Sequence, residues 1–235
     1  MTIDLKYPTT WDEVTREHLL MLGKLMTRKL TREELLFDLL CKITGLRPLL
    51  KQGIDEDTLV AEYHFKMKGK GKFTIPAWII RRACEQLSFL VDTVGLPECP
   101  ILSVHSKLHD VSFKAFYFAD AYLSRYQVTK DEDLMLKMYK ELTGMQIKKL
   151  DKAEVNAIVI WWCGLKEYLK QSYPEVLKDG DEQTDKTPAD ILNEILSVLN
   201  KNEPHMNKEI LKSDIHAVMH ALNNIYLTAK QHDNK

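Results

Sequence analysis

Two pairs of histidines stand four residues apart, a spacing that can place two metal ligands on one face of a helix. The pairs are His105 with His109 and His216 with His220. Imidazole is a common zinc ligand, and side chains at i and i+4 are neighbours on a helix. The second pair lacks the Glu that follows the first His of a zinc-peptidase helix, and the first pair need not be helical. Histidines on a polar face, or hydrogen-bonded at the end of an element, explain the spacing equally well, and we favour this interpretation.

Four lysines alternate along one short stretch of the chain, at Lys66, Lys68, Lys70 and Lys72. Such a row can contact a protein partner, or it can follow a phosphate backbone. The intervening glycines do not have the spacing of a phosphate-binding P-loop. The simplest interpretation is a solvated hairpin whose lysines discourage unwanted edge pairing. We take these lysines as the first surface to test for a protein partner.

No constellation of catalytic residues is evident. Asp120 is the only carboxylate within the most aromatic segment, where it would need a partner such as Lys114 or Arg125. A perturbed acid in a cleft would suggest catalysis, but a structural ion pair is the commoner role. No serine lies in a G-x-S-x-G motif, and no glycine loop fits a dinucleotide. The sequence therefore predicts a protein that is not an enzyme and needs no cofactor.

Composition points to an ordinary globular protein. The 235 residues include 33 basic and 34 acidic side chains, and the net charge of -1 gives no global attraction to nucleic acid or to an anionic membrane. The four cysteines form no C-x-x-C pair, and the first residues do not resemble a signal peptide. The longest uncharged run is too short to cross a bilayer. We expect a protein of the cytoplasm that does not enter membranes.

The elements that must position these residues are mostly helices. Residues 111–126 carry six aromatic rings in rows of helical spacing, which predicts a central helix buried on more than one side. A second aromatic helix, from Val155 to Tyr173, contains Trp161 and Trp162 and is the expected packing partner. Capping boxes near Thr10, Thr31, Thr129 and Asp151 predict further helix starts.

One stretch has the alternating pattern of strands instead. Apolar and polar residues alternate from Ala61 to Lys68, and Gly69 to Gly71 can form a tight turn, which predicts a β-hairpin near residues 59–75. The predicted fold is mainly α, a multi-helix bundle around the central aromatic helix with one small β-hairpin. We expect a main domain over residues 1–176, an acidic linker at 177–187, and a C-terminal helical unit over 188–235.

Several motifs resemble an uncharacterised family encoded in tail-gene clusters of bacteriophages and prophages of gut bacteria. The opening residues 7–15 are similar to its "P-x-x-W-x-E-L-T" start, and residues 161–169 match its "W-W-x-G-x-[KR]-x-Y-L" motif. Residues 116–126 and 215–219 also resemble it. These are packing motifs, so the resemblance implies no site residues. Its gene neighbourhood implies a tail-assembly or chaperone-like role.

We therefore expect a non-enzymatic phage or prophage protein that binds another tail component during assembly. The expected location is the cytoplasm of the bacterial host or the virion itself. One alternative is a nucleic-acid-binding regulator that uses the lysine-rich hairpin, although the neutral net charge disfavours it. A second alternative is a metal-dependent enzyme built on the histidine pairs. The sequence gives no oligomeric state.

Overall fold

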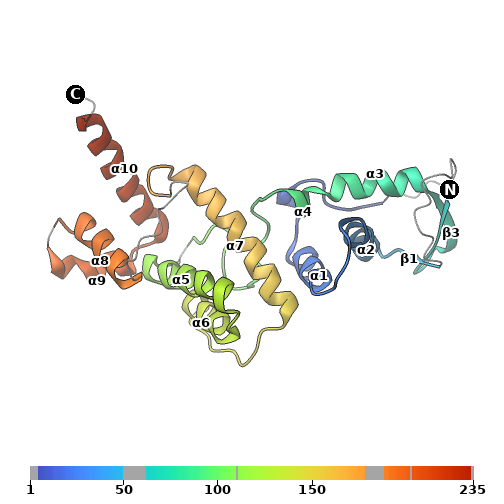
Figure 1. The fold of residues 1–235 in the computed structure, drawn as a ribbon, viewed down its shortest axis with the longest axis horizontal. Coiled ribbons are helices and arrows are strands. Elements are labelled where there is room, and N and C mark those ends of the chain that lie inside the picture. Colours follow the sequence, from blue (N-terminus) through green and yellow to red (C-terminus); the bar gives the residue numbers. More distant parts are fainter. Residues whose placement is uncertain (1–4, 50–61, 110, 178–187, 202, 234–235) are drawn as a thin grey trace. The chain divides into compact units, whose positions relative to one another are not determined.

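The computed structural model describes residues 5–49, 62–109, 111–177, 188–201 and 203–233. The chain divides into two compact units. Unit 1 comprises Met1–Pro100 and Asp151–Trp161, and unit 2 comprises Ile101–Leu150 and Trp162–Lys235. The fold is mainly helical with one small antiparallel sheet, as the sequence predicts (Figure 1). None of the helices in the described residues is long and apolar enough to cross a membrane.

This division differs from the predicted one. The predicted domain boundary near residue 177 falls inside unit 2, which joins the C-terminal helices to the aromatic central helix. A polar, charged stretch marks a loop, but it need not mark a boundary between units, because the elements on either side can pack together. Residues 178–187 of the predicted acidic linker lie outside the described residues.

The described part of Met1–Pro100 in unit 1 contains four helices with a short 3-10 turn ahead of them, and the N-terminal half of the later helix α7 (Lys152–Ser172) completes the unit. The 3-10 turn is η1 (Trp11–Glu13), and the helices are α1 (Arg16–Met26), α2 (Arg32–Thr44), α3 (Ala77–Leu87) and α4 (Phe89–Asp92). Thr31 caps α2 in a reciprocal capping box with Glu34, as predicted, and Gly45 ends that helix in the left-handed conformation.

The predicted helix start at Thr10 is wrong. Thr10 makes no side-chain capping bond, and only the short η1 follows it. The first long helix starts at Thr15, whose hydroxyl accepts from the His18 amide while the His18 ring accepts from the Thr15 amide. Glu13 instead accepts the Thr9 amide at 2.7 Å, so it stabilises the turn before the helix.

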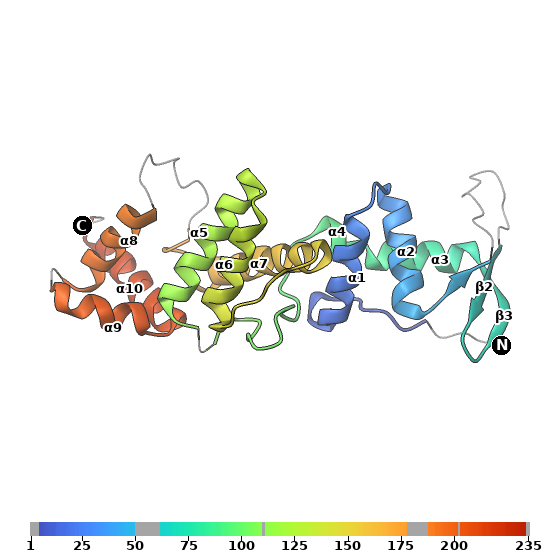
Figure 2. The ribbon, with the colours of Figure 1, turned by 90° about the horizontal axis from the view of Figure 1, so that it is seen from below.

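The sheet of unit 1 has three strands in the order β1 (Arg47–Pro48), β2 (Glu62–Met67) and β3 (Gly71–Pro76). The predicted hairpin is β2 and β3, seen as adjacent arrows in Figure 2. The tight connection has a positive φ at Gly69 and at Gly71. Residues other than glycine adopt such a backbone angle only with strain. The two-residue β1 is too short to recognise in the sequence.

Unit 2 is built from helices that pack around α5 (Phe113–Thr129). The others are α6 (Glu132–Thr143), the C-terminal half of α7 (Lys152–Ser172), α8 (Pro188–Leu199), α9 (Asn207–Lys212) and α10 (Ile215–Asp233), with a 3-10 turn η2 (Pro204–Met206) before α9. Helix α5 contacts α6, α9 and α10, so it is central to unit 2 (Figures 1 and 2). The predicted bundle around it does not include α1 to α4, which belong to the other compact unit.

The buried side of α5 is narrower than the aromatic rows predict. Its buried residues are Phe113, Phe116, Ala119 and Leu123. The row of Phe118, Tyr122 and Tyr126 is half-buried. The two tyrosines can keep their hydroxyl groups in water while the rings pack, and Phe118 is only partly covered, so aromatic spacing alone overstates how much of the helix is core.

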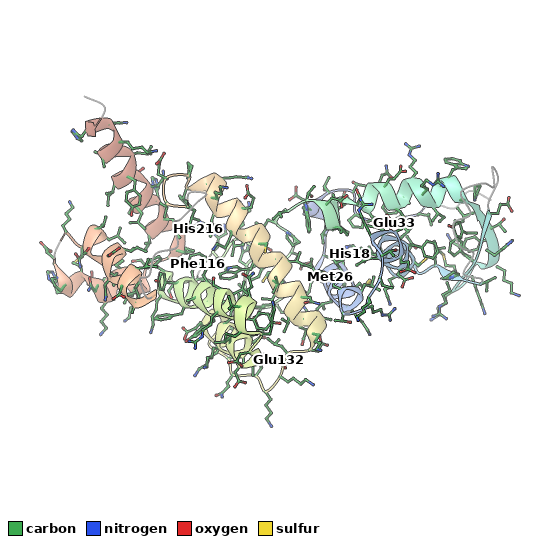
Figure 3. All side chains as sticks on the ribbon, viewed as in Figure 1. His18, Met26, Glu33, Phe116, Glu132 and His216 are labelled. Carbon is green, nitrogen blue, oxygen red and sulfur yellow. The ribbon has the colours of Figure 1, made fainter. Side chains whose placement is uncertain are left out.

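The expected contact between the two aromatic helices is present. Phe116 of α5 stacks on Trp162 of α7 with ring centroids 5.6 Å apart, and Figure 3 shows Phe116 between the two helices. The Trp162 indole N–H donates to Asp120 at 2.9 Å, and Lys166 pairs with the same carboxylate at 3.3 Å. Asp120 therefore has the structural role that we favoured, but its partner is Lys166 and not Lys114 or Arg125.

Candidate functional site

The first candidate site is the exposed face of the sheet in unit 1. Its opposite face is covered, because Phe65 is fully buried and the Phe37 ring of α2 packs on the sheet. The centroid of the Phe37 ring lies 5.5 Å from that of Tyr63 and 6.3 Å from that of Phe65. Alternate residues of a strand point to opposite faces. The neighbours of Phe65 along β2, His64 and Lys66, are accordingly exposed.

Three basic residues form a row across this exposed face. Arg47 of β1 is opposite Lys66 of β2, and Lys66 is opposite Lys72 of β3. Residues directly opposite in an antiparallel sheet have Cβ atoms about 5 Å apart, and like charges there repel. None of the three makes an ion pair within the described residues. We call Arg47, Lys66 and Lys72 the basic row.

Lys68 and Lys70, the other two predicted lysines, lie in the turn between β2 and β3 and are also exposed. The structure therefore brings Lys66 and Lys72 into register and leaves Lys68 and Lys70 at the tip. Sequence reasoning missed Arg47. Strand β1 is two residues long, so no local pattern marks Arg47; Pro48 beside it is compatible with an edge strand but names no partner strand.

The two edges of the sheet differ. The amide of Leu49, just after β1, donates to the His64 carbonyl. The backbone groups of Arg47 and Leu49 therefore bond to β2, and those of Pro48 face outward. Proline has no N–H, so this edge is blunted. By the same alternation, the backbone N–H and C=O groups of Tyr63, Phe65 and Met67 on β2 point toward β3.

The β3 edge is open among the described residues. Because Gly71, Phe73 and Ile75 bond to β2, the backbone N–H and C=O groups of Lys72 and Thr74 point away from the sheet. No hydrogen bond to these outward groups is present in the described part of the chain. Such an edge can accept another extended strand.

The second candidate site is a cluster of three histidines in unit 2. His105 and His109 lie in the turns between Ile101 and Ser112, not in a helix, and both are exposed. Their rings are 4.7 Å apart, and the His109 ring is 4.9 Å from that of His216 at the start of α10. Figure 3 shows His216 beside the C-terminal half of α7. No local pattern indicates that His216 lies beside the first pair, because the contact joins residues more than 100 positions apart.

Both ring nitrogens of His216 are already hydrogen-bonded. Nε2 lies 2.6 Å from the Lys107 carbonyl oxygen, and Nδ1 lies 3.0 Å from the Tyr173 hydroxyl. A carbonyl only accepts, so Nε2 carries a proton and donates to Lys107, while Nδ1 is joined to the Tyr173 hydroxyl. Burial raises the pKa of Tyr173, with smaller contributions from Tyr168 and Asp214, so this hydroxyl keeps its proton.

The histidine cluster offers no ligand set for a metal. Among the described residues, no group of three or more His, Cys, Asp or Glu side chains is arranged to hold a metal ion. His220 does not join the cluster; it is exposed and its Nδ1 lies 3.0 Å from the Asn224 amide nitrogen. His216 instead ties α10 to the turn at Lys107 and to the end of α7, which is the hydrogen-bonded role that we favoured.

Comparison with protein families, curated proteins and solved structures found no match for this chain. The site must therefore be judged from its own geometry. Of the two candidates, the histidine cluster has its central ring saturated by internal hydrogen bonds. Within the described ranges, the sheet presents positive charge without an ion-pair partner next to backbone groups without a hydrogen-bond partner, and it is the stronger candidate for binding.

Proposed function

We propose that this chain is a non-enzymatic phage or prophage protein that binds another tail component during tail assembly in the host cytoplasm, and that the exposed face of its sheet makes the contact. The class of partner comes from the resemblance to tail-cluster proteins. The observation that carries the binding role is the basic row, which places Arg47, Lys66 and Lys72 opposite one another with no acid among them.

Such a row is unfavourable in the free protein, because each neighbour repels the next. It becomes favourable when an anionic surface covers it, and complementary charge then speeds encounter and fixes the register of the complex. A lysine-rich tip beyond the row extends the same potential.

The test is co-purification of the tagged protein with the tail-tube and tape-measure proteins of its own gene cluster. We expect the wild type to retain one of them. A variant with Lys66, Lys68, Lys70 and Lys72 changed to Glu should lose it, whereas Lys148→Glu with Lys149→Glu, which reverses exposed charges in unit 2, should not. Failure of the wild type to retain either protein would overturn the proposal.

A further inference from the structure

The open β3 edge and the basic row together define what kind of segment can bind. We infer that the partner contributes an extended acidic segment that pairs with β3 as a fourth strand of the sheet. This inference rests on the proposed function for the biological partner, but the geometry that carries it is independent of the phage assignment.

The backbone groups on the edge select an extended peptide over other anions. Lys72 and Thr74 each direct one N–H donor and one C=O acceptor outward. A peptide strand offers both complements in the same alternation. A phosphate backbone supplies acceptors only, so it would leave both carbonyls without donors.

The basic row selects the charge of that segment. A residue paired with Lys72 would become the fourth member of the row, directly opposite a lysine. Opposite charges at such a position attract, and like charges repel. The best side chain there is Asp or Glu, and residues two positions away on the segment would share its face.

The same geometry argues against a second copy of this chain. Pairing β3 with β3 of another molecule would set Lys72 and its row against an identical edge, which carries the same positive charge. Lysine on an edge strand is a common device against self-association. The row therefore blocks a copy of the protein while it admits an acidic partner.

The covered face adds a preference for apolar side chains at the intervening positions. Phe73 is half-buried and Ile75 is buried on this face, at the rim beside the edge. A Val or Ile opposite Phe73 would extend the apolar layer. The predicted motif alternates acidic and apolar residues over about five to six positions, the usual length of a strand.

The test measures binding of a capped peptide of about eight residues in which Glu and Val alternate, by fluorescence anisotropy or calorimetry. The first control peptide has the same composition but places all Glu before all Val. The second keeps the alternation and has Lys in place of Glu. A third is the alternating peptide with N-methyl groups on alternate amides, which blocks pairing and keeps the charge. A DNA duplex of about 20 base pairs tests the alternative ligand.

Two variants separate the edge from the charge. Thr74→Pro removes one outward N–H and leaves the bonds between β2 and β3 intact, because the Thr74 amide faces away from β2. Lys72→Glu reverses the charge of the row at the edge. The matched control is Lys148→Glu, an exposed lysine of unit 2.

We expect only the alternating peptide to bind the wild type, with a fall in affinity of about tenfold or more in each of Thr74→Pro and Lys72→Glu. The Lys148→Glu control should bind as the wild type does. Equal binding of the N-methylated peptide would overturn edge pairing even if Thr74→Pro fails to fold. DNA binding that falls with Lys72→Glu, without peptide binding, would overturn the inference in favour of nucleic acid.

The two proposals can fail separately. If a tail protein is retained but the alternating peptide does not bind, the tail function stands and the fourth-strand inference is wrong. If the peptide binds with the expected pattern but no tail protein is retained, the edge is a binding site and the tail assignment is wrong.

Discussion

At the scale of single residues, the interior of unit 2 depends on one polar contact within an aromatic stack. Trp162 is 1% exposed, and its indole N–H donates to the half-buried Asp120 while its ring stacks on Phe116. Buried polar groups are stable only when paired, so the carboxylate fixes which way the indole lies. The ion pair with Lys166 is more exposed and contributes less.

We therefore predict that Asp120→Ala lowers the free energy of unfolding by about 1–3 kcal/mol, mostly through loss of the acceptor for Trp162. Asp120→Asn keeps an acceptor oxygen and removes the charge, so it should cost about 1 kcal/mol or less. Urea unfolding followed by tryptophan fluorescence measures both. Equal losses in the two variants would show that the ion pair, not the indole bond, is the larger contribution.

At the scale of elements, α1 and the first half of α7 approach more closely than side chains normally allow. A Cβ added at Gly23 would lie 2.3 Å from the Ala153 carbonyl oxygen, and Asn156 donates to the Gly23 carbonyl at 3.0 Å. Both helices belong to unit 1 at these positions. Glycine is thus required in the middle of a helix, where its intrinsic propensity is poor.

This contact decides whether replacing Gly23 by alanine raises or lowers the free energy of unfolding. Gly23→Ala would gain about 1 kcal/mol of helix propensity in an isolated helix, but here we expect a net loss of about 2 kcal/mol or more, because two backbones must separate. Gly144→Ala is the comparison, because a Cβ added there meets no atom within 4 Å. Its φ of +69° is unfavourable for alanine, so we expect this variant to lose about 1 kcal/mol of unfolding free energy. Thermal melting measures both, and a stabilised Gly23→Ala would contradict the close packing.

The histidines of α10 provide a second contrast between elements. His216 and His220 lie four residues apart on the same helix, yet only His216 bridges to Lys107 and Tyr173. Backbone hydrogen bonds also join the starts of α5 and α10: the Phe113 N–H donates to the Ser213 carbonyl, and the Ile215 N–H donates to the Val111 carbonyl. His216 therefore belongs to a junction of several elements.

We predict that His216→Ala lowers the free energy of unfolding by about 1–3 kcal/mol and speeds amide hydrogen exchange in the first turn of α10. His220→Ala should change stability by no more than about 0.5 kcal/mol, because that side chain is exposed. A zinc-dependent rise in melting temperature that needs both histidines would contradict this assignment and restore the metal hypothesis.

At the scale of the whole molecule, charge is balanced overall and concentrated locally. The chain has 33 basic and 34 acidic residues, but five basic residues gather on the exposed face and tip of the sheet: Arg47, Lys66, Lys68, Lys70 and Lys72. A local patch of this size can orient one acidic segment. A nucleic-acid site generally needs a larger basic surface, since each neutralised phosphate contributes separately.

We predict that the protein binds duplex DNA more weakly than about 0.1 mM at physiological salt, near the weak limit of non-specific binding. Changing Lys68, Lys70 and Lys72 to Ala should therefore leave any residual DNA affinity almost unchanged. Electrophoretic mobility shift over a range of salt concentrations measures this. Tight binding with a steep salt dependence that these variants abolish would favour the nucleic-acid regulator instead.

Local signals in the sequence were sufficient for much of the fold. The capping box at Thr31 and the glycine after α2 set that helix from residues close in the chain, and the same holds for Asp151 and Glu154 at the start of α7. The alternating pattern and the two glycines set the β2–β3 hairpin. Each of these signals acts within a few residues, so a single sequence contains the whole interaction.

Capping signals failed where two of them lay close together. The predicted cap is Thr10, but the N-cap of α1 is Thr15, five residues later. Likewise Thr129 is the last residue of α5, and α6 is capped by Asp131. The choice depends on where the apolar stripe must face, and that is decided by what the helix packs against.

The candidate site also combines features set by local sequence with features set by tertiary packing. The sequence by itself determined that this is a mainly helical protein with a lysine-bearing hairpin and no evident catalytic motif, because helix caps, turns and alternation are local. Only the tertiary structure placed Arg47 beside Lys66, opened the β3 edge at Thr74, and brought His216 to His109. These contacts join residues far apart in the chain, where many pairings satisfy the same local pattern and packing decides among them.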